Sequence, residues 1–154
     1  MWDVVAFGKY QGKGKTLPQV VFDDPDWFFW ALENGAFRET LAVQADEVGR
    51  KAQNIKIPGN DNGELVAEYV MHTPTNKFAG LEIVPKPQTL YSGSRALRRD
   101  RIDLGIVRRF KKYDKAGGKL LVGCVKHILF GAVRARLTRQ RCEEFFDDPK
   151  NFVP

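Results

Sequence analysis

The sequence has few of the residues on which most catalytic and metal sites depend. It contains two cysteines and two histidines in 154 residues, and these show no metal-ligand spacing. His72 and His127 fall in no recognised metal or nucleophile motif. Cys124 and Cys142 lie in apolar or helical contexts, so we expect buried thiols in a reducing cytoplasm rather than a disulfide. No catalytic residue, metal ligand or cofactor is predicted.

Long hydrophobic runs are also absent. No stretch approaches the roughly 20 apolar residues that a membrane-spanning helix needs. The apolar run between Asp3 and Lys9 is too short for a secretory signal. We therefore expect a cytoplasmic location and no membrane partner.

Positive charge, by contrast, is abundant and unevenly distributed. Residues 1–60 carry seven Lys and Arg against eight Asp and Glu, whereas residues 61–154 carry eighteen against eleven. The whole net charge of +6 therefore comes from the second part, and the pI is near 9.4. Such an excess indicates a partner that carries negative charge.

Two clusters account for most of this charge, one between Arg95 and Lys119 and one between Arg134 and Arg141. Dense clusters of one sign, rich in arginine, are typical of proteins that bind the phosphate backbone of nucleic acids. An acidic protein partner, an anionic membrane surface or simple solubility are the alternatives. We predict contacts to nucleic acid, DNA in preference to RNA, from Arg98, Arg99, Arg101, Arg108, Arg109, Lys111, Lys112, Arg134 and Arg136.

Near the N-terminus, Trp2–Phe7 has the composition of a short strand, followed by a glycine-bracketed turn. Lys9, Tyr10 and Lys13 lie in this turn and are predicted to form an auxiliary anion-binding loop. The alternative is structural, with Tyr10 packed on Trp27. The run from Gly12 to Thr16 misses the spacing of a nucleotide-binding phosphate loop by one residue.

The second helix is predicted from Asp24-Pro25, as N-cap and first helical residue, to a stop at Asn34-Gly35. Its aromatic residues Trp27, Phe28 and Trp30 are expected mainly in the core. A third helix is predicted over 37–55, with a buried stripe of Leu41, Val43, Ala45, Val48 and Ala52.

These N-terminal motifs resemble those of a known family. Phe7-Gly8-Lys9-Tyr10-Gln11-Gly12-Lys13, followed by Asp24-Pro25-Asp26-Trp27, is similar to the C-terminal domain of exonuclease X-like proteins and to related stand-alone quorum-sensing-regulated virulence factors. Gly14-Lys15, inserted before Thr16, departs from that pattern, and the likeness covers about the first third of the chain. The resemblance implies an association with DNA-processing proteins.

Turn-forming residues from Pro58 to Gly63 mark the best boundary in the chain. Beyond it, 65–72 and 78–84 are predicted to form a β-hairpin and 103–112 a basic helix. Residues 114–118, which include the glycine pair Gly117-Gly118, are expected to end that helix. The apolar run that follows at 120–130 suits a strand or a helix. Alternation predicts a strand at 133–138, and Thr138 is expected to cap a helix over 139–146.

The sequence therefore predicts an α+β fold, with a small N-terminal strand-turn-helix module at 1–57 and a basic mixed α+β region at 64–154, either separate or sharing one core. The expected function is a non-catalytic nucleic-acid-binding or accessory protein of bacterial or mobile-element DNA metabolism. A regulator that binds an acidic protein is the second interpretation. The third is a divalent-metal nuclease that uses carboxylates among Asp61, Glu64, Glu68 and Glu82.

Overall fold

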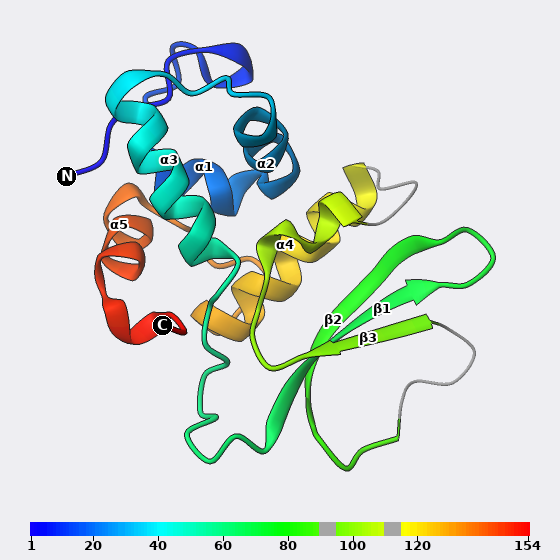
Figure 1. The fold of residues 1–154 in the computed structure, drawn as a ribbon. Coiled ribbons are helices and arrows are strands. Elements are labelled where there is room, and N and C mark those ends of the chain that lie inside the picture. The colour runs from blue at the N-terminus through cyan, green and yellow to red at the C-terminus, as the bar shows by residue number, and fades with distance from the viewer. Residues whose placement is uncertain (90–94, 110–114) are drawn as a thin grey trace.

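The computed structural model describes residues 1–89, 95–109 and 115–154. Within them, helices and a single antiparallel sheet, with strand order β2-β1-β3, form an α+β fold, which confirms the predicted class (Figure 1). The elements are α1 (Leu17–Asp23), α2 (Pro25–Glu33), α3 (Glu39–Ala52), β1 (Leu65–His72), β2 (Lys77–Pro85), β3 (Arg95–Arg99), α4 (Lys115–Phe130) and α5 (Arg139–Asp147), with short 3-10 turns η1 (Gly8–Tyr10), η2 (Leu104–Arg109) and η3 (Pro149–Asn151).

The predicted N-terminal strand is wrong. Val4 makes one isolated bridge with Thr16, and no strand forms at Trp2–Phe7. The apolar side chains of Trp2 and Val5 are instead buried in the core. A β-forming composition needs a neighbouring strand for its hydrogen bonds, and this segment has helices beside it.

The N-termini of α1 and α2 follow from local capping. Thr16 and Gln19 form a capping box at the start of α1. At α2, a carboxylate oxygen of Asp24 accepts a hydrogen bond from the Trp27 backbone N–H at 3.1 Å, and Pro25 occupies the first helical position. The prediction for the start of α2 is confirmed.

The aromatic residues of α2 divide between core and surface. Phe28, Phe29 and Ala31 are buried, and Trp27 is half-buried. Trp30 is 46 % exposed, so its predicted place in the core is wrong. Its position follows from helix geometry: at 3.6 residues per turn it lies about half a turn from the buried Phe28, on the outer side.

The predicted third helix is confirmed as α3. Its inward stripe holds Ala45, Val48 and Ala52, all fully buried. Val43 was expected in the same stripe but is 71 % exposed, because it lies two residues from Ala45 and so points away from the core.

The hairpin is confirmed as β1 and β2, which pair from Leu65–Pro85 to His72–Lys77. The third strand, β3, was not predicted; it pairs antiparallel with the other edge of β1. In the sequence analysis its arginines were considered only as part of the first basic cluster.

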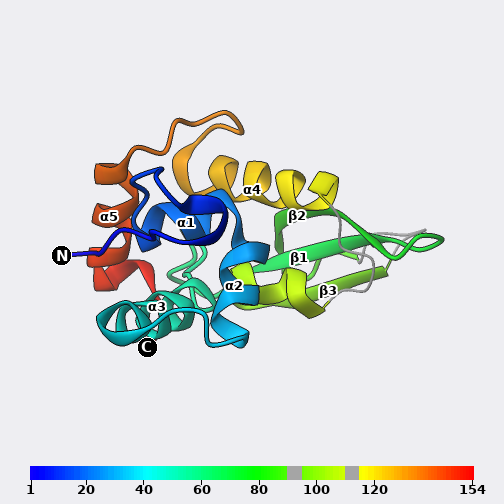
Figure 2. The ribbon, with the colours of Figure 1, turned by 90° about the horizontal axis from the view of Figure 1, so that it is seen from above.

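The apolar run at 120–130 belongs to α4, which packs against β2 (Figure 2). The helix runs through Gly117-Gly118, so the predicted break there is wrong: packing on the sheet outweighs the low helix propensity of glycine. The predicted strand at 133–138 is also wrong, because this segment is an irregular connection with no strand beside it. The last helix is confirmed as α5, where the Thr138 hydroxyl accepts a hydrogen bond from the Arg141 N–H.

The predicted basic helix at 103–112 is replaced over its described part by η2, and 110–112 lie outside the described residues. A buried side-chain cap explains the change. The Asp103 carboxylate accepts a hydrogen bond from the Gly105 N–H at 2.8 Å, and the Asp103 N–H donates to the Tyr69 hydroxyl at 2.7 Å. Asp103 itself is 4 % exposed. Such local carboxylate-to-backbone bonds favour a tight turn over a continuing α-helix.

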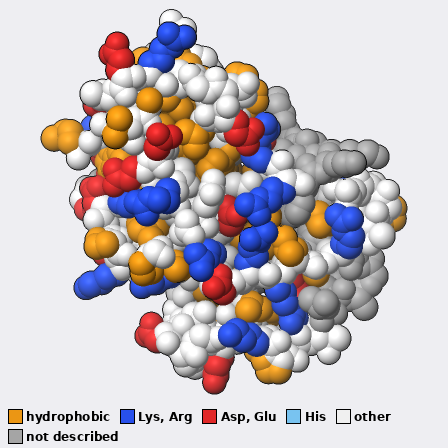
Figure 3. All heavy atoms as spheres, viewed as in Figure 1, with side chains coloured by type: hydrophobic (Ala, Val, Ile, Leu, Met, Phe, Trp, Pro, Cys, Tyr) orange, Lys and Arg blue, Asp and Glu red, His pale blue; other side chains and the backbone are white. Residues whose placement is uncertain are grey.

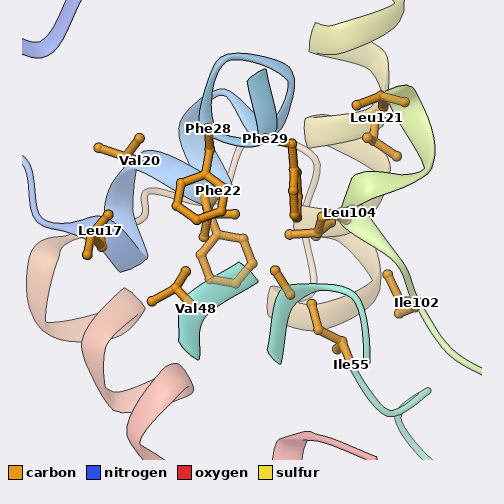
Figure 4. Close-up of a cluster of buried hydrophobic side chains, with 14 of the residues drawn as sticks. Leu17, Val20, Phe22, Phe28, Phe29, Val48, Ile55, Ile102, Leu104 and Leu121 are labelled. Carbon is orange, nitrogen blue, oxygen red and sulfur yellow. The ribbon is translucent and has the colours of Figure 1, made fainter. Parts of the chain in front are cut away.

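One hydrophobic core includes residues from both sides of the turn at 58–63 (Figure 4). Phe28 and Phe29 from α2, Leu104 from η2 and Leu121 from α4 all belong to it. Ile55 bridges to both Ile102 and Phe152. The N-terminal helices therefore bury their apolar side chains together with residues of the second half of the chain.

Candidate nucleic-acid interface

The N-terminal loop is held by internal contacts. The Tyr10 hydroxyl donates a hydrogen bond to Asp23 at 2.7 Å, and its ring packs edge-on against Trp27 with 5.0 Å between centroids. Lys9 forms an ion pair with Asp24, the N-cap of α2. Burial and the nearby Asp23 carboxylate raise the pKa of Tyr10. Tyr10 is 2 % exposed and is unsuited to ligand contact, which supports the structural alternative; Lys13 remains exposed.

In the first arginine cluster, Arg98 has a structural role. Its Nε atom donates to Glu68 at 2.7 Å, and its two terminal nitrogens donate to the carbonyl oxygens of Lys86 and Gln88. Glu68 is 1 % exposed, so Arg98 neutralises a buried carboxylate and also holds residues 86–88. Arg98 is therefore engaged by groups of the protein itself, and its predicted phosphate contact stays a prediction.

Two further arginines of this cluster are neutralised in the same way. Arg101 pairs with Asp100 and donates to the side chain of Asn54. Arg108 pairs with Asp26 at 2.9 Å and with Glu33 at 3.0 Å, which ties η2 to α2. Each of these two guanidinium groups is therefore paired with carboxylates of the protein itself.

The remaining predicted residues of the cluster differ from one another. Arg99 is half-buried. Arg109 is 54 % exposed and lies 3.9 Å from an oxygen of Asp103. Lys111 and Lys112 lie outside the described residues. On the face shown in Figure 3, Lys and Arg side chains are interspersed with Asp and Glu side chains. The densest basic stretch of the sequence therefore does not give a continuous cationic surface over the described residues.

A second group of cations lies together on the fold. Arg141 of α5 donates to the carbonyl oxygen of Arg136, and its guanidinium lies over the Phe130 ring at 5.0 Å. The pKa of the buried Cys142 thiol is lowered by three of these positive charges: Lys15 of the N-terminal loop, Lys126 of α4 and Arg141 of α5. Figure 2 shows the connection (orange) that leads from the end of α4 to the start of α5. We call this group the cationic patch: Lys13, Lys15, Lys126, Arg134, Arg136 and Arg141.

Among residues 1–89, 95–109 and 115–154, none of the six side chains of the cationic patch has a carboxylate within ion-pair distance. Lys13, Arg134, Arg136 and Arg141 are exposed, and Lys15 and Lys126 are half-buried. Cations without a protein counter-charge are available to an external anion. Sequence reasoning had selected only three of them, Lys13, Arg134 and Arg136. Arg141 was visible in the second cluster and Lys15 in the lysine-bearing N-terminal loop, but neither was among the predicted contacts; nothing in the sequence indicated Lys126.

Two grooves flank α4. One, of about 940 Å³, lies between α2 and α4 and is lined by Trp27, Trp30, Lys119, Val122 and Lys126, among others. The other, of about 850 Å³, lies between α4 and β2 and has apolar walls, made mainly of Leu81, Ile83, Leu120, Cys124 and Ile128.

The carboxylates considered for a metal nuclease do not assemble a centre. Over residues 1–89, 95–109 and 115–154, no group of three His, Cys, Asp or Glu side chains is placed to hold a metal ion. Glu68 is committed to Arg98, whereas its cross-strand partner Glu82 is exposed. Nor is any helix in the described part of the chain both long enough and apolar enough to cross a bilayer.

Burial of Cys142 predicts a pH dependence of the free energy of unfolding. Burial raises the pKa of its thiol from 9.0 to about 11, and the charges of Lys15, Lys126 and Arg141 oppose that rise. Below pH 9 the thiol is protonated in the folded and unfolded chain alike. Between about pH 9 and 11 only the unfolded chain loses the proton, so the free energy of unfolding falls as the pH rises, by at most about 2 to 3 kcal/mol from this group.

Urea unfolding at pH 8 and pH 11 measures this effect. The loss of stability between the two pH values should be smaller in Cys142→Ala than in the wild type, whereas Cys124→Ala, at a half-buried thiol, should behave as the wild type. Tyr10 and Tyr69, whose pKa values are also raised by burial, contribute equally to all three proteins. An identical pH dependence in wild type and Cys142→Ala would contradict the assignment.

Fold and patch together define a small α+β protein with a cationic surface built from its N-terminal loop, α4 and α5. No family model, no curated protein sequence and no solved structure matches the chain. The resemblance to the exonuclease X-like C-terminal domain thus stays a prediction from its motifs.

Proposed function

We propose that this protein binds nucleic acid through the cationic patch, as a non-catalytic accessory protein that contacts the phosphate backbone. The observation that carries the proposal is a set of six cations from separate segments that have no carboxylate partner among the described side chains. Three of them, Lys15, Lys126 and Arg141, lie near enough to the Cys142 thiol to lower its pKa. Arginine and lysine side chains that displace counterions from phosphates supply most of the affinity of such proteins. The exonuclease X-like motifs favour DNA as the natural target.

The patch fits backbone contact better than base recognition. It is formed by a loop, an irregular connection and two helix flanks, without a helix or ribbon shaped to enter a groove of the duplex. Contacts to phosphate position a protein on nucleic acid but carry little sequence information. We therefore expect weak dependence on sequence and strong dependence on salt.

Removal of patch charges tests the proposal. The triple variant Lys126→Ala, Arg134→Ala, Arg136→Ala should bind a DNA oligonucleotide more weakly at low salt. Each lost phosphate contact should reduce the slope of log affinity against log salt by about 0.7 to 0.9. Fluorescence anisotropy over a salt series measures both quantities.

The matched control removes three exposed charges elsewhere, in Arg50→Ala, Lys56→Ala, Lys150→Ala. It has the same net charge as the patch variant and should keep most of the wild-type affinity and slope. Equal losses in both variants would mean that net charge, and not the patch, governs binding. A wild-type protein that binds neither DNA nor RNA at low salt would overturn the proposal and favour an acidic protein partner.

A further inference from the structure

Trp30 is an exposed aromatic side chain without a structural role in the core. Its indole is 46 % exposed, and it belongs neither to the core cluster nor to the residues packed against it. Among the described residues, its ring makes no aromatic contact, and no hydrogen bond from its indole nitrogen is formed. A single exposed apolar residue is common on protein surfaces, so Trp30 is informative only through the groove that it lines.

Trp30 lines the groove of about 940 Å³ between α2 and α4. The facing wall comes from α4, where Gly118 has no side chain and Gly123 packs closely against Val133. Val122 and Val133 add apolar surface to the lining of the groove. A concave site with an apolar wall and a few charged groups suits a planar ligand.

The charges of this groove favour an anionic ligand. Asp24 is paired with Lys9, and Asp26 with Arg108, so two of its three carboxylates are neutralised within the protein. The third, Asp23, accepts the Tyr10 hydrogen bond. Two other cations of the groove, Lys119 and Lys126, have no carboxylate partner among the described side chains.

Lys126 connects the groove to the cationic patch, because it belongs to both. The groove that contains Trp30 therefore adjoins the patch at Lys126. In a duplex the faces of the bases are covered by their neighbours, whereas in a single strand a base is free to stack on an aromatic side chain.

We propose that the groove accepts an unpaired base stacked on Trp30, with the flanking phosphates at Lys119 and Lys126, so that the protein prefers single-stranded nucleic acid. This inference rests on the proposed function and adds the strand specificity. Stacking is tolerant of base identity, since every base has an aromatic face, which agrees with the weak sequence dependence expected of the patch.

The test compares Trp30→Ala and Trp30→Phe with the wild type on two probes: an oligothymidylate of about 15 nucleotides and a hairpin duplex with the same number of phosphates. Trp30→Ala should lose about tenfold or more of its single-strand affinity and little of its duplex affinity. Trp30→Phe should retain most of both, because a phenyl ring also stacks. The salt slope should not change in either variant, since no charge is removed.

Val43→Ala is the matched control, because Val43 is another exposed apolar residue, on α3. It should bind both probes as the wild type does, and the thermal midpoint of Trp30→Ala should also stay close to the wild-type value. A Trp30→Ala variant with unchanged single-strand affinity, or with equal losses on both probes, would overturn the inference. In that outcome the salt slope and the patch variant still decide the proposed function, so the two failures are distinguishable.

Discussion

Replacement of Arg98 by alanine is expected to lower the free energy of unfolding by about 3 kcal/mol. The reason is the carboxylate left behind: Glu68 lies in the central strand β1, is 1 % exposed, and is held by Arg98 at 2.7 Å. Breaking a buried ion pair from one side leaves an uncompensated charge, which costs about 3 to 5 kcal/mol. Because the Arg98 side chain is itself 20 % exposed, the lower end of that range is expected.

Chemical denaturation of three proteins separates the causes. Arg109→Ala, at a 54 % exposed side chain, should change stability by less than about 1 kcal/mol. Adding Glu68→Gln to Arg98→Ala should recover part of the loss, because the buried group is then neutral. If Arg98→Ala were as stable as the wild type and bound DNA more weakly, the first arginine cluster would be an interface after all.

Phe28→Ala is expected to lower the free energy of unfolding by about 3 to 5 kcal/mol. Phe28 is fully buried, and its ring contacts Phe29 and Phe37 with centroid distances of 5.1 and 5.5 Å. Removing it opens a cavity among side chains that other elements hold in place. Trp30→Ala, two residues along the same helix, should shift stability by no more than about 0.5 kcal/mol.

This pair of variants shares a helix and a large-to-small aromatic change, so the contrast isolates burial. Thermal and urea unfolding should rank them in the same order. A Trp30→Ala variant as unstable as Phe28→Ala would mean that the exposed indole supports the fold, and would remove the basis for a stacking role.

The sequence predictions are accurate where the structure depends on residues that are close together in the chain, and fail where it depends on distant ones. Asp24-Pro25 and Thr138 each determine a helix start through bonds that span three residues, and both starts are confirmed. β3 was not predicted because its arginine-rich sequence lacks the apolar pattern of a strand. Arg98 is accommodated there because its side chain donates a hydrogen bond to Glu68, thirty residues earlier in the chain. The Gly117-Gly118 pair was expected to end a helix, but packing of α4 on β2 decided otherwise.

The same distinction applies to the candidate interface. Charge density along the chain shows where cations occur, but not which carboxylates they meet in the fold. Arg108 finds Asp26 and Glu33 more than seventy positions earlier, which no short window of sequence reveals. Lys15 belongs to a lysine-bearing loop and Lys126 to an apolar run of the sequence, and the two come near Arg141 only in the folded chain.

The bridges of Ile55 have a consequence for biosynthesis. Ile55 pairs with Ile102 and with Phe152, and the Trp2 indole donates a hydrogen bond to Asp147 at 2.9 Å. The first three helices thus leave the ribosome well before the residues that complete their surroundings have been translated. Contacts so distant along the chain are formed late and slow folding. The N-terminal segment should therefore remain a loosely ordered, chaperone-accessible intermediate during synthesis, and become protease-resistant only after α5 is released.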